Sequence, residues 1–207
     1  MPTSLSPIWV PIILFGLCGL CLAIHRQFRF DHDRTIDEVT VFLRRLDWQE
    51  AKELFDVRGE RYLRIVQSKY HFRRTMRVRI HEAREFLWRM YHNVRVVHEW
   101  ANTELRDIAD KSVERYTERE RLIVAVADRA AHFRMFAVFR LIELTLWTVL
   151  RVEKWPLLRI PSVATLRKCG AEGEVDILEL YNQVKNAAAG LALTYGKEFY
   201  DDMLALL

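Results

Sequence analysis

Residues 76–101, MRVRIHEAREFLWRMYHNVRVVHEWA, decide the fold of the domain that this chain encodes. The apolar positions of the segment follow one another at steps of four, three, four, three, four, three and four residues. These positions are Met76, Ile80, Ala83, Leu87, Met90, Val94, Val97 and Ala101. Such spacing keeps one apolar seam on a helix over more than three heptads, and Leu105 and Ile108 continue it after a stutter. We therefore expect a long, straight helix that packs nearly parallel to its neighbours, as in a bundle or coiled coil.

Residues that break helices are rare in the rest of the chain. The 207 residues include seven glycines and five prolines, and three of the prolines lie at or before position 11. Between Thr35 and Trp155, Gly59 is the one strong interruption of the helical pattern, and runs of alternating β-branched residues are missing. We therefore predict that residues 31–207 form one all-α domain, an elongated bundle of four or five helices with coiled-coil-like packing.

Capping motifs mark the starts of the helices that precede the seam. Thr35-Ile-Asp-Glu38 is one capping box, and Asp47-Trp-Gln-Glu50 is a second, whose short helix should end before Gly59. After the seam, the charged segment 110–121 is predicted to hold a turn or an exposed helix end.

Two further helices are expected after that segment. One covers residues 122–150, and the other covers residues 174–206. A loop that contains Pro156, Pro161, Gly170 and Gly173 should separate them. The last helix includes the small-residue run 186–190, which should pack closely on a neighbouring helix.

A different pattern occupies the start of the chain. The first 24 residues carry no charged side chain, and the run 8–24, IWVPIILFGLCGLCLAI, is followed closely by Arg26 and Arg29. An apolar run of this length with a positive flank is typical of a single membrane-spanning helix. We expect residues 1–30 to be a transmembrane anchor and juxtamembrane segment, with the lipid bilayer as partner of the run. The positive-inside rule then places residues 31–207 in the cytoplasm.

Two other interpretations of this run, a cleaved signal peptide and a buried hydrophobic helix, have less support. No Lys or Arg precedes the run, and a small-x-small cleavage motif is missing, which argues against a signal peptide. Cys18 and Cys21 are best explained as packing residues, and together with Cys169 they imply no disulfide framework. Gly19 and Ala23 form a small-xxx-small pair through which two copies could associate as a homo-oligomer.

Charge is segregated along the predicted domain. Residues 61–95 carry ten basic and two acidic side chains, whereas residues 31–60 carry five basic and nine acidic ones. One interpretation is that acidic terminal helices lie beside basic middle helices of the same bundle. The other is that the basic run meets an acidic protein or anionic lipid headgroups, which attract each basic side chain by about 1 kcal/mol. The residues of this candidate surface are Arg64, Lys69, Arg73, Arg74, Arg77 and Arg79.

Tryptophans provide a second indication of an interface. Trp9 would lie at the outer boundary of the predicted span, where an indole ring is favoured. Trp147 and Trp155 stand beside Arg151, Lys154 and Arg159, as in an interfacial element. The alternative for these two is a loop whose tryptophans fill the base of the core.

A further candidate site lies in the predicted helix 122–150. This helix is the most apolar after the anchor, yet ionisable residues interrupt it, and buried ionisable groups need partners. The interrupting residues form either a polar network in the bundle core or a solvated stripe. The residues are Asp128, Arg129, His132, Arg140 and Glu143.

Motifs of known chemistry are missing from the sequence. It contains no Gly-rich phosphate loop, nucleophile elbow or H-E-x-x-H motif. None of His81, His92 and His98 has a glutamate three residues before it, as a di-iron site in a bundle requires. We therefore predict no catalytic residue, metal or cofactor.

Three functional hypotheses follow. The first is a non-enzymatic, membrane-anchored interaction or scaffold domain whose basic long helix meets an anionic membrane or an acidic protein. The second is an enzyme or small-ligand-binding bundle that uses Asp128, His132, Arg140 and Glu143, which requires these side chains to converge in one enclosed pocket. The third is a membrane-tethered nucleic-acid binder, which is disfavoured because no nucleic-acid-binding motif accompanies the arginines.

Overall fold

The computed structural model describes residues 35–109, 118–149, 162–163, 167–169 and 175–207. All of them belong to one compact unit of the chain, Arg34–Leu207. The predicted membrane span at residues 8–24 lies outside the described residues, and so do Trp9 and Trp155. The helices of the described part are all too short or too polar to cross a membrane.

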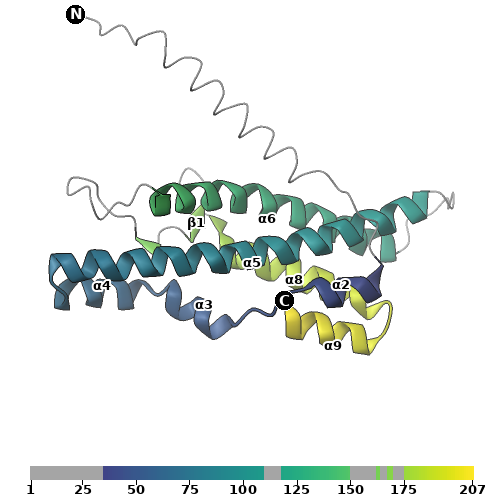
Figure 1. Ribbon diagram of the computed structural model, residues 1–207. Helices are drawn as coiled ribbons and strands as arrows, with labels where there is room; N and C mark the ends of the chain where they lie inside the picture. Colours follow the sequence, from purple (N-terminus) through teal and green to yellow (C-terminus); the bar gives the residue numbers. More distant parts are fainter. Residues whose placement is uncertain (1–34, 110–117, 150–161, 164–166, 170–174) are drawn as a thin grey trace, which may run out of the picture. The chain divides into compact units, whose positions relative to one another are not determined.

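Two long helices form the centre of this unit. Helix α5 (Lys69–Ala109) has 41 residues and is therefore about 60 Å long, and α6 (Glu118–Val149) runs back along it with 32 residues (Figure 1). All eight seam positions between Met76 and Ala101 are buried, with exposed fractions of 4% or less. The prediction of a long, seam-packed helix in a helical bundle is thus confirmed.

Helices α8 (Ile177–Leu193) and α9 (Lys197–Leu206) complete the bundle, α8 packing on α6 and α9 packing on α8. The predicted small-residue face is confirmed, because Ala187, Ala188 and Ala189 are buried. The prediction of one continuous last helix is wrong. The chain turns at Gly196, whose φ of 145° lies in the region that favours glycine, and α9 then folds back.

A small sheet precedes α8. Strands β1 (Lys168–Cys169) and β2 (Val175–Asp176) pair antiparallel, with Lys168 opposite Asp176. Asp176 also caps α8 by accepting a hydrogen bond of 2.9 Å from the Leu178 N–H. The fold is therefore mainly helical, with one short hairpin that the all-α prediction did not include.

Three short helices lead into α5. They are α2 (Ile36–Phe42), α3 (Trp48–Leu54) and α4 (Val57–Val66). Asp47 caps α3 as predicted, whereas Thr35 precedes α2 without a side-chain capping hydrogen bond. Gly59 lies in the first turn of α4, where its N–H donates to the Asp56 carboxylate at 2.8 Å, so the expected break at Gly59 is wrong. The described ranges contain seven helices rather than four or five.

One buried amide connects three parts of the bundle. Asn93, on α5, accepts a hydrogen bond from the Arg44 N–H at 2.8 Å and donates to the Arg44 carbonyl at 2.7 Å. It also donates to the Tyr181 hydroxyl of α8 at 3.2 Å. The α2–α3 linker, α5 and α8 are thereby held in one register.

We predict that Asn93→Leu lowers the free energy of unfolding by about 2–4 kcal/mol, because the change leaves the Arg44 backbone groups and the Tyr181 hydroxyl without their partner. Urea unfolding followed by circular dichroism measures the loss. The exposed Arg89→Ala on the same helix is the control. A loss for Asn93→Leu no larger than that of the control would contradict the assigned role.

Candidate functional site

The basic residues singled out in the sequence lie on α4 and on the first three turns of α5, and they differ in what they contact. Arg79 donates to the carbonyls of Glu53 and Leu54 at 3.1 and 2.5 Å. It therefore closes the C-terminal end of α3 and holds that helix on α5. Arg64 lies 3.8 Å from the buried Glu60 carboxylate, and its guanidinium stands 5.4 Å from the centre of the Phe72 ring.

The remaining basic side chains face outward at the junction of α4 and α5. Lys69, Arg74 and Arg77 are exposed, and Arg73 is half-buried. Arg58 and Arg61 of α4 are exposed as well. We call five of these the basic corner: Arg58, Arg61, Lys69, Arg74 and Arg77. Arg58 and Arg61 are not among the residues of the predicted surface, although Asp56 before them is a regular helix-capping residue and indicates that a helix begins there.

Large apolar side chains are exposed beside the basic corner. The exposed fractions are 83% for Ile65, 72% for Tyr70, 65% for Tyr62 and 61% for Val66. The one carboxylate of α4, Glu60, is instead buried and accepts a hydrogen bond of 2.7 Å from the Ser162 hydroxyl. The outer side of this corner therefore combines positive charge with apolar surface and lacks a carboxylate of α4.

The five residues proposed as a polar network on α6 do not come together. Nδ1 of His132 lies 3.4 Å from the Asp128 carboxylate, and both side chains are more than half exposed. Arg129 donates to the Gln183 carbonyl of α8 at 3.4 Å. Arg140 pairs with Glu143 and donates to the Lys168 carbonyl of β1. These four contacts lie in three separate places, so the convergence that the second hypothesis requires is not seen. Trp147 packs, partly buried, against the core.

A buried polar pair lies elsewhere on α6. Arg134 is 1% exposed and donates to Nδ1 of His98, on α5, at 2.8 Å. Its guanidinium also lies 5.7 Å from the centre of the Tyr91 ring. Next to His98, the buried Glu99 accepts a hydrogen bond of 2.7 Å from Nε of Arg95. Arg134 follows the buried Ala130 by four residues and therefore lies on the same side of α6. This spacing is the feature of the sequence that indicates a buried Arg134.

This pair keeps His98 neutral. Burial, and then the nearby Arg134 charge, lower the pKa of His98 to about 4, with Glu99 acting in the opposite direction. Because Nδ1 accepts the hydrogen bond from Arg134, the imidazole proton resides on Nε2. The pair thus gives one guanidinium N–H of Arg134 and Nδ1 of His98 a partner inside the bundle.

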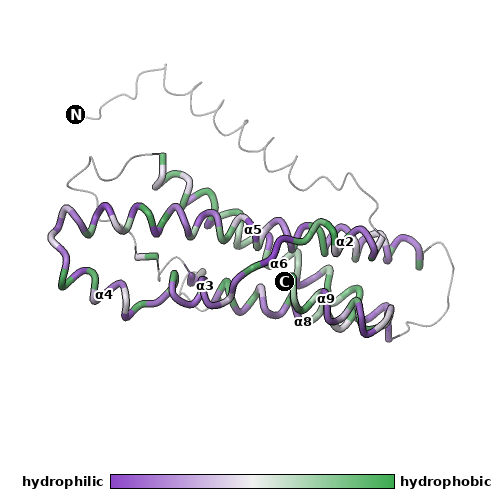
Figure 2. Tube along the Cα trace, turned by 60° about the horizontal axis from the view of Figure 1, so that its bottom comes forward, coloured by the Kyte–Doolittle hydropathy of each residue, from purple (hydrophilic) through white to green (hydrophobic). Residues whose placement is uncertain are grey.

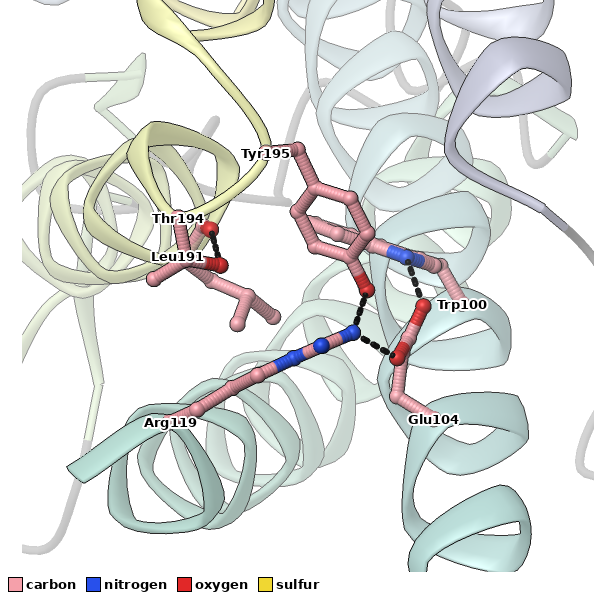
Figure 3. A network of polar contacts seen from close by, with 6 residues as sticks. All are labelled: Trp100, Glu104, Arg119, Leu191, Thr194 and Tyr195. Atoms are coloured by element: carbon pink, nitrogen blue, oxygen red, sulfur yellow. Dashed lines mark hydrogen bonds and ion pairs between the residues drawn. The ribbon is translucent and has the colours of Figure 1, made fainter. Parts of the chain in front are cut away.

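A second polar cluster joins α5, α6 and the α8–α9 turn (Figure 3). Arg119 donates to the Glu104 carboxylate at 2.7 Å and to the Tyr195 hydroxyl, and it lies over the Tyr195 ring at 4.7 Å. The buried Trp100 donates to Glu104 at 3.2 Å. Burial and the Glu104 carboxylate raise the pKa of Tyr195 to about 12, so the phenol stays protonated. This cluster matches donors to acceptors and acts as a structural clasp.

Within the described residues, groups of three or more His, Cys, Asp or Glu arranged to hold a metal ion are not found. Comparison with known proteins adds no family assignment. No family model, no curated protein and no solved structure matches the chain. The candidate site is therefore argued from its own residues, and the basic corner is the described cluster of exposed positive charge.

We predict that stability falls on acidification through His98. Its folded pKa of about 4 lies below the unfolded value of 6.5, so the stabilisation is fully present above pH 6.5 and is lost as the pH falls toward 4. The loss approaches about 1.4 kcal/mol per pH unit. Urea unfolding should show a smaller pH slope for His98→Gln than for the wild type. A wild-type slope in His98→Gln would contradict this role of His98.

We also predict that Tyr195→Phe lowers the free energy of unfolding by about 1 kcal/mol, because Arg119 loses one acceptor while keeping Glu104. Thermal unfolding measures the change. Tyr200→Phe, at a half-buried tyrosine of α9, is the matched control. If both variants unfold like the wild type, the Tyr195 hydroxyl contributes nothing to stability.

Proposed function

We propose that this protein is a non-enzymatic, membrane-anchored helical domain that docks its basic corner on the anionic surface of the membrane that holds it. The observation that carries the proposal is the concentration of exposed basic side chains at the α4–α5 junction, beside exposed apolar ones. The uncharged run 8–24 with its basic flank supports the anchor. The cytoplasmic placement belongs to the same proposal.

Electrostatics favours this arrangement. Anionic headgroups attract each nearby Lys or Arg by about 1 kcal/mol, so the five residues of the basic corner supply up to about 5 kcal/mol. That attraction falls off within about 8 Å at physiological salt, so the domain must be held close to the bilayer. Ten residues separate position 24 from Thr35, and a chain of that length reaches at most about 36 Å. An anchor therefore raises the local concentration of the surface that the corner would bind.

The alternative in which the basic run only neutralises acidic helices of the same bundle has less support. Ion pairs of the run include Arg64 with Glu60, Arg84 with Glu85, and Arg95 with Glu99. In each of these three pairs, both residues belong to the same helix. None of the three connects the basic run to the acidic helices α8 and α9. The carboxylates of Glu60 and Glu99 are buried, whereas the Arg84–Glu85 pair is partly exposed and contributes at most about 1 kcal/mol.

The test uses the full chain in lipid nanodiscs. We predict slower amide hydrogen exchange of α4 and the first turn of α5 in discs that contain phosphatidylglycerol than in discs of phosphatidylcholine alone. High salt should remove the difference, because the attraction is screened. Peptides of α9 serve as the internal reference.

Charge-reversal variants sharpen this test. Lys69→Glu with Arg74→Glu removes two attractions and adds two repulsions, so about 4 kcal/mol of docking energy and the slower exchange should be lost. Arg121→Glu reverses an exposed charge on the first turns of α6 and should leave the slower exchange intact. Equal exchange of α4 in the two kinds of disc would overturn the proposal.

A further inference from the structure

Helix α4 is an amphipathic helix whose apolar residues the fold does not use. In the described part of the chain, the hydrophobic core and the side chains packed on it include no residue of α4. Its side chains Tyr62, Ile65 and Val66 are all more than half exposed. Figure 2 shows apolar segments of α4 alternating with hydrophilic ones along the outside of the bundle. Single exposed apolar residues are normal on a protein surface. Several of them on one short helix form a patch, and such patches mark interaction sites.

Five of the exposed side chains of α4 share one face, and the other two, Val57 and Arg64, lie beside it. At 100° per residue, Arg61, Ile65, Arg58, Tyr62 and Val66 fall in this order within an arc of about 140°. The buried Glu60 and the half-buried Leu63 lie on the opposite side. We call these five residues the α4 outer face. It carries two guanidinium groups, three apolar side chains and no carboxylate.

Polar contacts, rather than apolar packing, hold α4 in place. Hydrogen bonds from the N–H groups of Arg58 and Gly59 cap its start and lower the pKa of Asp56. The buried Glu60 accepts from Ser162 at 2.7 Å, as described above. The helix is therefore formed and oriented before it meets a partner, and binding costs it little conformational entropy.

The chemistry of this face fits a bilayer surface. An interfacial helix places basic side chains among phosphates and apolar ones at the boundary of the acyl chains. Tyr62, and Tyr70 at the start of α5, have an apolar ring and a polar hydroxyl, a combination that is favoured at this depth. A helix that presents its apolar residues on the outside of the bundle matches a deformable planar surface, and its positive charge matches anionic headgroups.

We propose that α4 is an interfacial helix that inserts Tyr62, Ile65 and Val66 at the headgroup–acyl boundary of an anionic bilayer, with Arg58 and Arg61 on the phosphates. The inference rests on the proposed function and deepens it, because docking by charge alone requires no insertion.

The test uses the full-length protein and measures how deeply the side chain at position 65 enters the bilayer. Ile65→Cys, in a background with Cys18, Cys21 and Cys169 changed to Ser, is labelled with an environment-sensitive fluorophore and reconstituted in nanodiscs. In discs with phosphatidylglycerol, the emission should shift to shorter wavelength and be quenched by lipids spin-labelled near the headgroup. The matched control is Val124→Cys, an exposed apolar position on α6, whose label should stay in water.

Two further arms separate insertion from charge-driven docking. Arg58→Glu with Arg61→Glu should abolish the quenching of the label at position 65. Tyr62→Ser with Val66→Ser should reduce the quenching while the salt-sensitive exchange difference persists. A label at position 65 that stays water-exposed while α4 exchange still slows in anionic discs overturns the insertion and leaves the proposed docking standing. If neither signal responds to anionic lipid, both proposals fail, and an acidic protein becomes the partner to seek.

Discussion

The structure depends on burying one apolar seam, the row of side chains that runs along α5 from Met76 to Ala101. Contact of these apolar side chains with water is unfavourable, so other helices must cover the row, and all eight side chains are buried. Helix α6 packs along α5, and α8, whose alanines Ala187, Ala188 and Ala189 are buried, then packs on α6. The remaining described elements attach to this packed core or, like α4, to its edge.

Two buried polar side chains of the core, Asn93 and Arg134, form hydrogen bonds to particular positions on other elements. Asn93 satisfies the backbone of the α2–α3 linker and the Tyr181 hydroxyl, and Arg134 finds a neutral imidazole at His98. An apolar seam alone permits helices to slide along one another, since each heptad resembles the next. Hydrogen bonds between particular positions remove that freedom and select one alignment, as a buried polar residue does in a coiled coil.

Local patterns in the sequence predicted what depends on local physics. The seam was predictable because its spacing is a property of one helix, and so was the Asp47 cap, which acts over three residues. Gly59 was misjudged because glycine is tolerated in a first helical turn, where a cap already holds the backbone. Arg134 meets His98 across 36 positions, and Arg79 caps α3 from another helix. Such roles follow from tertiary neighbours, which spacing along one helix does not specify.

The choice of which side chains of α4 are buried and which are exposed is relevant to function. A fold that merely needed stability would turn the apolar residues of α4 toward the core, since burying a side chain such as Ile65 contributes about 2 kcal/mol. Here the buried side of α4 carries Glu60, which requires a hydrogen bond to be tolerated, and Ile65 is exposed instead. The orientation thus forgoes stability that the sequence could supply. Such an arrangement is expected where an outward apolar face gains its stabilisation from a surface outside the domain.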